Sequence, residues 1–76
     1  MVTRLSEELL ALCEDQVRQF AEIVAQQMAL IKRLERDGLL EEVRRERAML
    51  ATFETGLELA REHLRIEGAA RRRPGF

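Results

Sequence analysis

Apolar residues recur at alternating steps of three and four residues in two long stretches of the chain, and one Asp-Gly pair separates these stretches. Such spacing keeps one stripe of a helix apolar, as at the seam between two packed helices. The first series consists of Leu10, Cys13, Val17, Phe20, Val24, Gln27, Ile31 and Leu34. The second series consists of Leu39, Val43, Glu46, Leu50, Phe53, Leu57, Ala60 and Leu64. The pattern predicts an all-α chain built from two long helices.

The chain is expected to reverse at the Asp-Gly pair. Its glycine is the first in the sequence, and glycine readily adopts the left-handed backbone conformation that ends many helices. Ser6 and Asp37 are candidate N-caps, because short polar side chains accept hydrogen bonds from the first free N–H groups of a helix. We predict a helical hairpin over residues 1–67, with helices at about 4–36 and 39–67, a turn at about 37–38, and a flexible basic tail from Gly68 to Phe76.

Folding the chain at this turn brings the two series into one constant antiparallel register. The two polar members, Gln27 and Glu46, then share a layer, and Phe20 and Phe53 share another. We interpret the Gln27–Glu46 layer as a device that fixes the register at the expense of some stability. Two other interpretations stay open, namely a rim position at which Glu46 reaches water and a ligand site built on paired carboxylates.

The apolar stripe of the hairpin is wider than a two-helix seam requires. The residues that flank the seam are Leu9, Ile23 and Leu30 on one side of the first helix, Ala21 and Met28 on the other side, and Leu40 and Met49 on the second helix. Two helices side by side cannot enclose a core, and a chain of this size usually needs oligomerisation or another staple. We therefore predict a homodimer in which two hairpins form an antiparallel four-helix bundle, with the two series as its core and interface. The alternative is a hairpin that covers a helix of another protein.

Charge and composition limit the classes of partner. The 76 residues carry 13 Lys plus Arg against 14 Asp plus Glu, which argues against a strongly electrostatic nucleic-acid binder. The run Arg71, Arg72 and Arg73 is the candidate contact for nucleic acid or an acidic partner. A single Cys fits a reducing compartment, and no apolar run approaches the roughly 20 residues of a membrane helix. We expect a cytoplasmic protein without membrane association.

Catalytic and metal-binding motifs find little support in the sequence. Cys13 and His63 fall near the same level of the predicted hairpin, so a reactive thiol or half of a metal site is one interpretation. A buried, unreactive Cys13 is the interpretation that we prefer. Glu62 and His63 are adjacent, which excludes the inward Glu-x-x-His motif of di-iron bundles. Gly56, inside the second helix, predicts either close helix approach or a bend. We expect no enzymatic activity, cofactor or metal.

The two-helix layout and the short turn resemble those of Rop, an RNA-binding hairpin that dimerises into a four-helix bundle. The resemblance covers the architecture and includes no residue motif, so it assigns no functional residue. We expect a non-enzymatic hairpin module that self-associates and binds another protein through its helix faces. One alternative is a small Rop-like nucleic-acid-binding regulator that uses surface or tail Arg residues. Another is a small chaperone or secretion co-factor for a helical partner.

Overall fold

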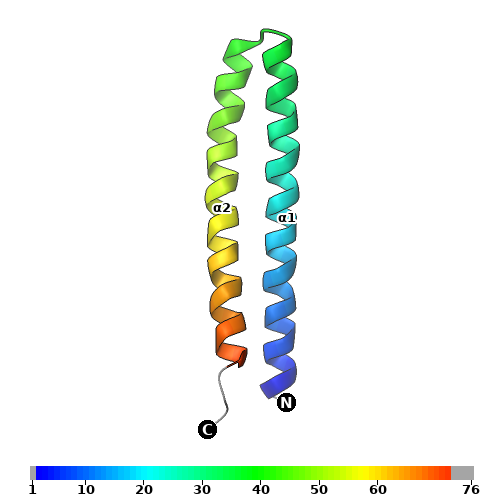
Figure 1. Ribbon diagram of the computed structural model, residues 1–76, viewed down its shortest axis with the longest axis vertical. Coiled ribbons are helices and arrows are strands. Elements are labelled where there is room, and N and C mark those ends of the chain that lie inside the picture. Colours follow the sequence, from blue (N-terminus) through cyan, green and yellow to red (C-terminus); the bar gives the residue numbers. More distant parts are fainter. Residues whose placement is uncertain (1, 73–76) are drawn as a thin grey trace.

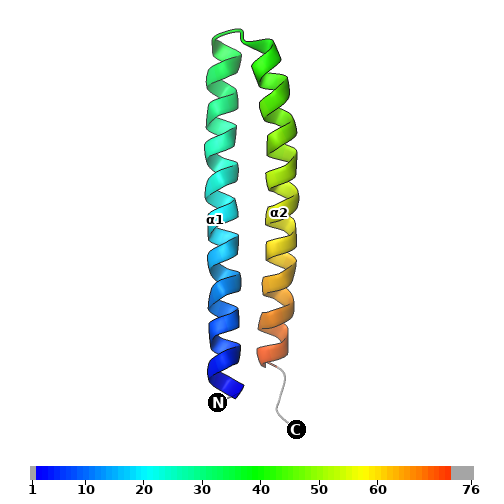
Figure 2. The same ribbon diagram turned by 180° about the vertical axis from the view of Figure 1, so that it is seen from behind.

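The chain forms two long antiparallel helices that lie side by side along their whole length (Figure 1). This computed structural model describes the backbone of residues 2–72 and the side chains of residues 6–70. Helix α1 spans Val2–Arg36 and helix α2 spans Leu40–Arg72, in a molecule of 59 × 14 × 12 Å. The view from behind shows the same single layer of two helices (Figure 2). The all-helical hairpin that the spacing predicts is confirmed.

The turn between the helices has the hydrogen bonds of a Schellman motif. The N–H of Gly38 donates to the carbonyl of Glu35 at 3.1 Å, and the N–H of Leu39 donates to the carbonyl of Leu34 at 3.0 Å. Gly38 has a φ of +72°, in the left-handed region that favours glycine. A Cβ atom added to Gly38 would meet nothing within 4 Å. Backbone conformation, and not lack of space, is therefore the reason for glycine at the turn.

Helix α2 is longer than the sequence predicts. We predicted that Gly68 ends the helix and that residues 68–76 form a flexible tail, but the helix continues through Gly68 to Arg72. Gly68 does not adopt a positive φ, and the Ala and Arg residues that follow it are strong helix formers. A glycine ends a helix only where the backbone turns left-handed, and here it does not. Residues 73–76 of the predicted tail lie outside the described residues.

The starts of both helices also differ from the predicted caps. Helix α1 begins at Val2, so Ser6 lies within the helix and does not precede it. At the start of α2, the N–H of Val43 donates to the carbonyl of Leu39 at 2.9 Å. Leu39 thus occupies the N-cap position, which we predicted for Asp37, because the chain needs two residues beyond Asp37 to complete the Schellman turn.

The core is a narrow ribbon between the two helices. The described side chains that are buried are Cys13, Ile31, Val43, Leu57 and Ala60. All of them belong to the two apolar series, and most other members of these series are half-buried. Two cylinders in contact along one line shield only the side chains on that line, so the width of the ribbon follows from the architecture. The rest of the apolar surface remains on the two broad faces of the hairpin.

Candidate interaction surfaces

Gln27 and Glu46 meet across the seam in the predicted register. The side-chain amide of Gln27 donates through Nε2 to Oε1 of Glu46 at 2.6 Å and to the backbone carbonyl of Glu46 at 3.0 Å. Both side chains are half-buried. No buried polar side-chain atom among the described residues lacks a hydrogen-bond partner. The layer therefore joins the helices through a satisfied pair of bonds while its carboxylate keeps contact with solvent.

The helices approach closely at Gly56. A Cβ atom at this position would lie 2.5 Å from Cε1 and 2.9 Å from Cζ of the Phe20 ring. These separations are far below van der Waals contact, so the ring edge of Phe20 occupies the space that any larger residue at position 56 would need. Of the two explanations that the sequence allows for this glycine, the geometry matches close approach. Helix α2 continues through Gly56 without interruption.

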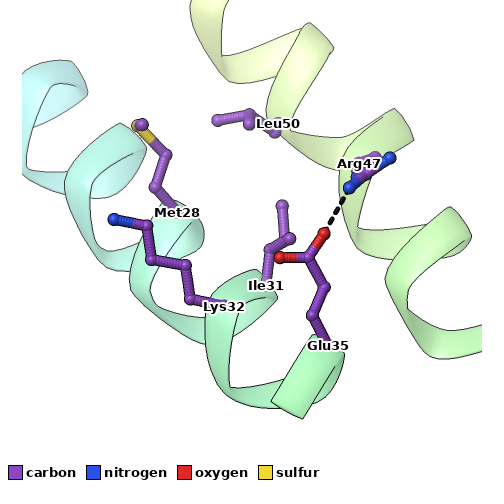
Figure 3. A pocket seen from close by; sticks show the side chains of 6 residues that line it. All are labelled: Met28, Ile31, Lys32, Glu35, Arg47 and Leu50. Carbon is purple, nitrogen blue, oxygen red and sulfur yellow. Dashed lines mark hydrogen bonds and ion pairs between the residues drawn. The ribbon is translucent and has the colours of Figure 1, made fainter. Parts of the chain in front are cut away.

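One broad face of the hairpin, which we term the charged face, carries both acidic and basic side chains. Its members follow from helical spacing on the two sides of the seam: Glu14, Arg18, Met28, Lys32 and Glu35 on α1, and Leu40, Arg44, Arg47, Glu54, Glu58, Arg61 and Arg65 on α2. Arg47 forms an ion pair with Glu35 across the seam (Figure 3). The pair lines one side of a shallow pocket that Met28, Ile31, Lys32 and Leu50 also line. Water and ion pairing solvate this face in the single hairpin.

The opposite broad face, which we term the apolar face, carries no formal charge along most of its length. Its members are Leu9, Leu12, Gln16, Gln19, Ile23, Gln26 and Leu30 on α1, and Met49, Thr52, Gly56, Leu59, His63 and Ile66 on α2. None of them is Asp, Glu, Lys or Arg. Several are strongly exposed, and Leu59 reaches 67%. Contiguous exposed apolar surface of this kind typically marks an interaction site.

A groove runs over the apolar face at the level of Gly56. It is lined by Gln16, Phe20, Gly56, Leu59, Ala60 and His63. Gly56 and the Phe20 ring packed against it lie next to each other in this lining. Ile23 and Met49 lie nearer the turn on the same face, and Met49 is 51% exposed. The face thus has a groove toward the chain ends and an exposed apolar pair toward the turn.

Three exposed residues of the apolar face lie outside the flanking positions that we predicted. These residues are Leu12, Leu59 and Ile66. They belong to a third stripe, one step farther around each helix than the residues directly beside the seam. A visible signal was the seven-residue spacing from Leu59 to Ile66, which matches the repeat of the core series.

Cys13 and His63 have different environments. Cys13 is 5% exposed and occupies a core position, whereas His63 is exposed and lines the groove. Cys13 is not among the groove-lining residues. Within the described part of the chain, no group of three or more His, Cys, Asp or Glu side chains is arranged to hold a metal ion.

The outer surface carries a short ion pair within α2. Arg65 donates through Nε to Oε2 of Glu62 at 3.0 Å and through Nη2 to Oε1 at 2.5 Å. The hydrogen bond from Arg65 holds the pKa of Glu62 below its ordinary value, and the same bond raises the pKa of Arg65. Both groups are exposed, so this pair contributes little to folding.

The arginine run predicted to contact nucleic acid or an acidic partner falls at the limit of the described chain. Arg71 and Arg72 belong to the last turn of α2, but their side chains lie outside the described residues, as does all of Arg73.

These features define the class of protein as a two-helix antiparallel hairpin with one charged and one apolar face. The chain gives no match to any family model, curated protein or solved structure with which it was compared. Neither α1 nor α2 contains, in its described residues, an apolar segment that could cross a membrane.

Proposed function

We propose that this chain is a non-enzymatic, cytoplasmic assembly module that pairs with a second copy to form a four-helix bundle, and that the bundle binds another protein through its outer helix faces. The observation that carries this proposal is the uncovered apolar face. Leu12, Leu59 and Ile66 extend over both helices on this face without a single interposed charge. Burial of such a face is the main favourable term in protein association.

The accessible area supports a partner of comparable size. The single chain exposes 6277 Å², whereas a compact monomer of 8.8 kDa exposes about 4,800 Å². The excess of roughly 1,500 Å² is larger than the ~800 Å² that one partner buries in an interface of standard size. It corresponds to the larger and more apolar interfaces of obligate homodimers. A second hairpin, with the same length and the same apolar face, supplies a surface of matching extent.

The narrow core gives a second argument for association. Only a few described side chains on the seam are buried in the single hairpin, and Phe20 and Phe53 remain half-buried. Small chains rarely reach useful stability from such a core, and oligomerisation is a common remedy. Pairing would cover Phe20 and the groove beside it, so folding and assembly are expected to be coupled.

Sedimentation velocity combined with light scattering tests this proposal. The expected result is a species of twice the 8.8 kDa chain mass at micromolar concentration, with helical circular dichroism and a melting temperature that rises with concentration. A stable, cooperatively folded monomer across the whole concentration range would refute it. A chain that folds only when a helical partner is added would instead favour the chaperone or co-factor alternative.

The composition of the charged face argues against nucleic-acid binding, which is the alternative function. Acidic residues such as Glu54 and Glu58 are interspersed with its basic residues, and this mixture reduces attraction to phosphates. Titration with RNA and DNA at low salt separates the two functions. Micromolar binding that weakens steeply with salt would support the Rop-like alternative.

A further inference from the structure

We infer that two copies of the chain pair through their apolar faces with the hairpins pointing in opposite directions, so that Ile23 and Met49 of each copy seat in the Gly56 groove of the other. This inference rests on the proposed function, because it specifies the surface and the geometry of the same self-association. Three independent features of the hairpin support it, namely the distribution of charge, the shape of the apolar face and the charges beside the turn.

The distribution of charge selects the face. Pairing through the charged face would remove water from Arg18, Lys32 and Glu54 and from the Glu35–Arg47 ion pair. Desolvation of charges often exceeds the attraction that they gain in a buried interface. The apolar face has neutral polar groups instead, and Gln19 and Thr52, which lie near the level of Phe20, can form hydrogen bonds with their equivalents. Away from the turn, two identical apolar faces therefore meet without a buried, unpaired charge.

The shape of the apolar face selects the relative direction of the two copies. The groove at Gly56 and the exposed pair Ile23 and Met49 lie at different levels along the hairpin. If both turns were at the same end, the groove of one copy would face the groove of the other copy. The pair Ile23 and Met49 of one copy would likewise face the same pair of the other. With the turns at opposite ends, a two-fold axis near the level of Phe20 exchanges the two features. Each exposed pair then seats in the groove that Gly56, Phe20 and Leu59 line on the other copy, as complementary packing requires.

The charges beside the turn give the same direction. Arg33, Glu42 and Arg45 occupy the turn end of the stripe that is otherwise uncharged. Pairing with both turns at one end would gather four arginines and two glutamates around the axis, with net repulsion. In the opposite arrangement, the two Arg33 residues are separated by about 40 Å along the bundle, given 1.5 Å per residue on either side of the axis. Glu67 of the second copy then lies at the level of Arg33.

Distances between nitroxide labels on the two copies test the face and the direction together. Each variant carries Cys13→Ala, which removes the buried native thiol, and one exposed cysteine: Gln19→Cys, Arg18→Cys or Arg33→Cys. Residues 18 and 19 form a matched pair, because they are adjacent in sequence and lie at the same level on opposite broad faces. Light scattering first establishes the mass of each labelled variant, and pulsed electron paramagnetic resonance then measures the label-to-label distance.

The expected result is a dimer in which the label at position 19 gives a clearly shorter distance than the label at position 18, and the label at position 33 gives about 40 Å. A dimer with the order of positions 18 and 19 reversed would overturn the choice of face. A dimer with a short distance at position 33 would overturn the direction. In both cases self-association stands, whereas a monomeric Cys13→Ala protein that is helical and cooperatively folded would refute the proposed function itself.

A pair of methionine variants tests the seating of Met49. Met49 on the apolar face and Met28 on the charged face are 51% and 46% exposed in the single hairpin, so truncation removes similar surface. Met49→Ala is expected to raise the dimer dissociation constant roughly 10- to 100-fold, since two copies of the side chain leave the interface. Met28→Ala is expected to leave it unchanged. Equal effects of the two variants, or a larger effect of Met28→Ala, would contradict the inference.

Discussion

The charged face and the apolar face lie on the same two helices and flank the same core, but their side chains relate to water in different ways. On the charged face, Glu35 and Arg47 pair across the seam, and the face carries further acidic and basic groups. On the apolar face, Leu12, Leu59 and Ile66 are exposed, and the stripe that they share carries no charged side chain away from the turn. Ion pairs on an exposed surface contribute little stability, yet they keep that surface compatible with solvent.

The contrast between the faces separates two roles that one hairpin combines. A face with mixed charge resists burial, because each ion would lose hydration, and it therefore stays on the outside of an assembly. A face without charge gains free energy when it is covered, at about 25 cal/mol per Å² of apolar surface. Under the proposed self-association, the uncharged face is the one expected to pair with a second copy, and the charged face is the one expected to stay outside that pairing. The predictions below test this division, beginning with the largest expected effect.

A charge placed on the apolar face should have the largest effect. We expect Leu59→Glu to weaken the dimer a thousandfold or more, because the symmetric interface would bury two unpaired carboxylates. Leu40→Glu is the matched control on the charged face, since Leu40 and Leu59 are 74% and 67% exposed. Sedimentation equilibrium measures both dissociation constants. Equal weakening by the two substitutions would show that the faces do not differ in their role.

Loss of the aromatic ring beside the groove should have the next largest effect. We expect Phe20→Ala to lower the free energy of unfolding by about 3 to 5 kcal/mol, the usual result for a Phe that is buried in the assembled state. Chemical denaturation at fixed protein concentration provides the measurement. A loss below about 1 kcal/mol would place the ring of Phe20 on an uncovered surface and would argue against burial of the apolar face.

A methyl group at Gly56 should have a smaller effect whose sign depends on Phe20. In the native background, Gly56→Ala is expected to destabilise by about 1 to 3 kcal/mol, because its Cβ meets the ring of Phe20. Combined with Phe20→Leu, the same change should stabilise by up to ~1 kcal/mol, the helix propensity gained over glycine. A double-mutant cycle measures the coupling. Destabilisation of equal size in both backgrounds would rule out close approach as the reason for Gly56.

The hairpin itself is predictable from sequence because two repeating patterns and one glycine act locally. The steps of three and four residues predict both helices and the seam, and the constant register places Gln27 opposite Glu46, where the hydrogen bonds are found. The turn at Gly38 follows from the backbone freedom of glycine. Each of these features follows from a repeating pattern or a single residue type that can be recognised in the sequence alone.

The helix ends and the full apolar face depend on geometry that the pattern leaves open. A glycine such as Gly68 ends a helix only if the backbone turns left-handed there, and the sequence alone does not specify its φ. Likewise, the third stripe that contains Leu12 and Leu59 becomes part of one face only when the two helices lie side by side. An exposed Leu on a single helix is unremarkable, whereas several on one face of a hairpin indicate an interface.

The polar layer should affect choice of register more than stability. We expect Gln27→Leu, or Glu46→Leu, to change the free energy of unfolding by no more than about 1 kcal/mol in either direction, because one half-exposed hydrogen-bonded pair is replaced by apolar contact. The label distances at position 33 should broaden, since a polar layer disfavours slipped packings. Outright unfolding by either substitution, or an unchanged distance distribution in both, would contradict a role in register.

The smallest effect is expected at the Glu62–Arg65 pair, which lies on the exposed surface of α2 away from the apolar face. The hydrogen bond from Arg65 depresses the pKa of Glu62 below its ordinary value of 4.5 in the folded chain. A carboxyl with a depressed folded pKa contributes stability that is fully present above the unfolded value and is lost as the pH falls through the folded value. Because both groups are exposed, this contribution at pH 7 is too small to move the melting temperature, and acidification below about 4.5 should remove it. Nuclear magnetic resonance titration of the Glu62 carboxyl compares the native chain with Arg65→Gln, and the pKa of Glu62 should return toward 4.5 in the variant. The melting temperature and the dimer dissociation constant at pH 7 should stay unchanged within error. A marked rise in the dissociation constant of Arg65→Gln would show that this outer surface takes part in pairing, and the division between a solvated and a covered face would no longer hold.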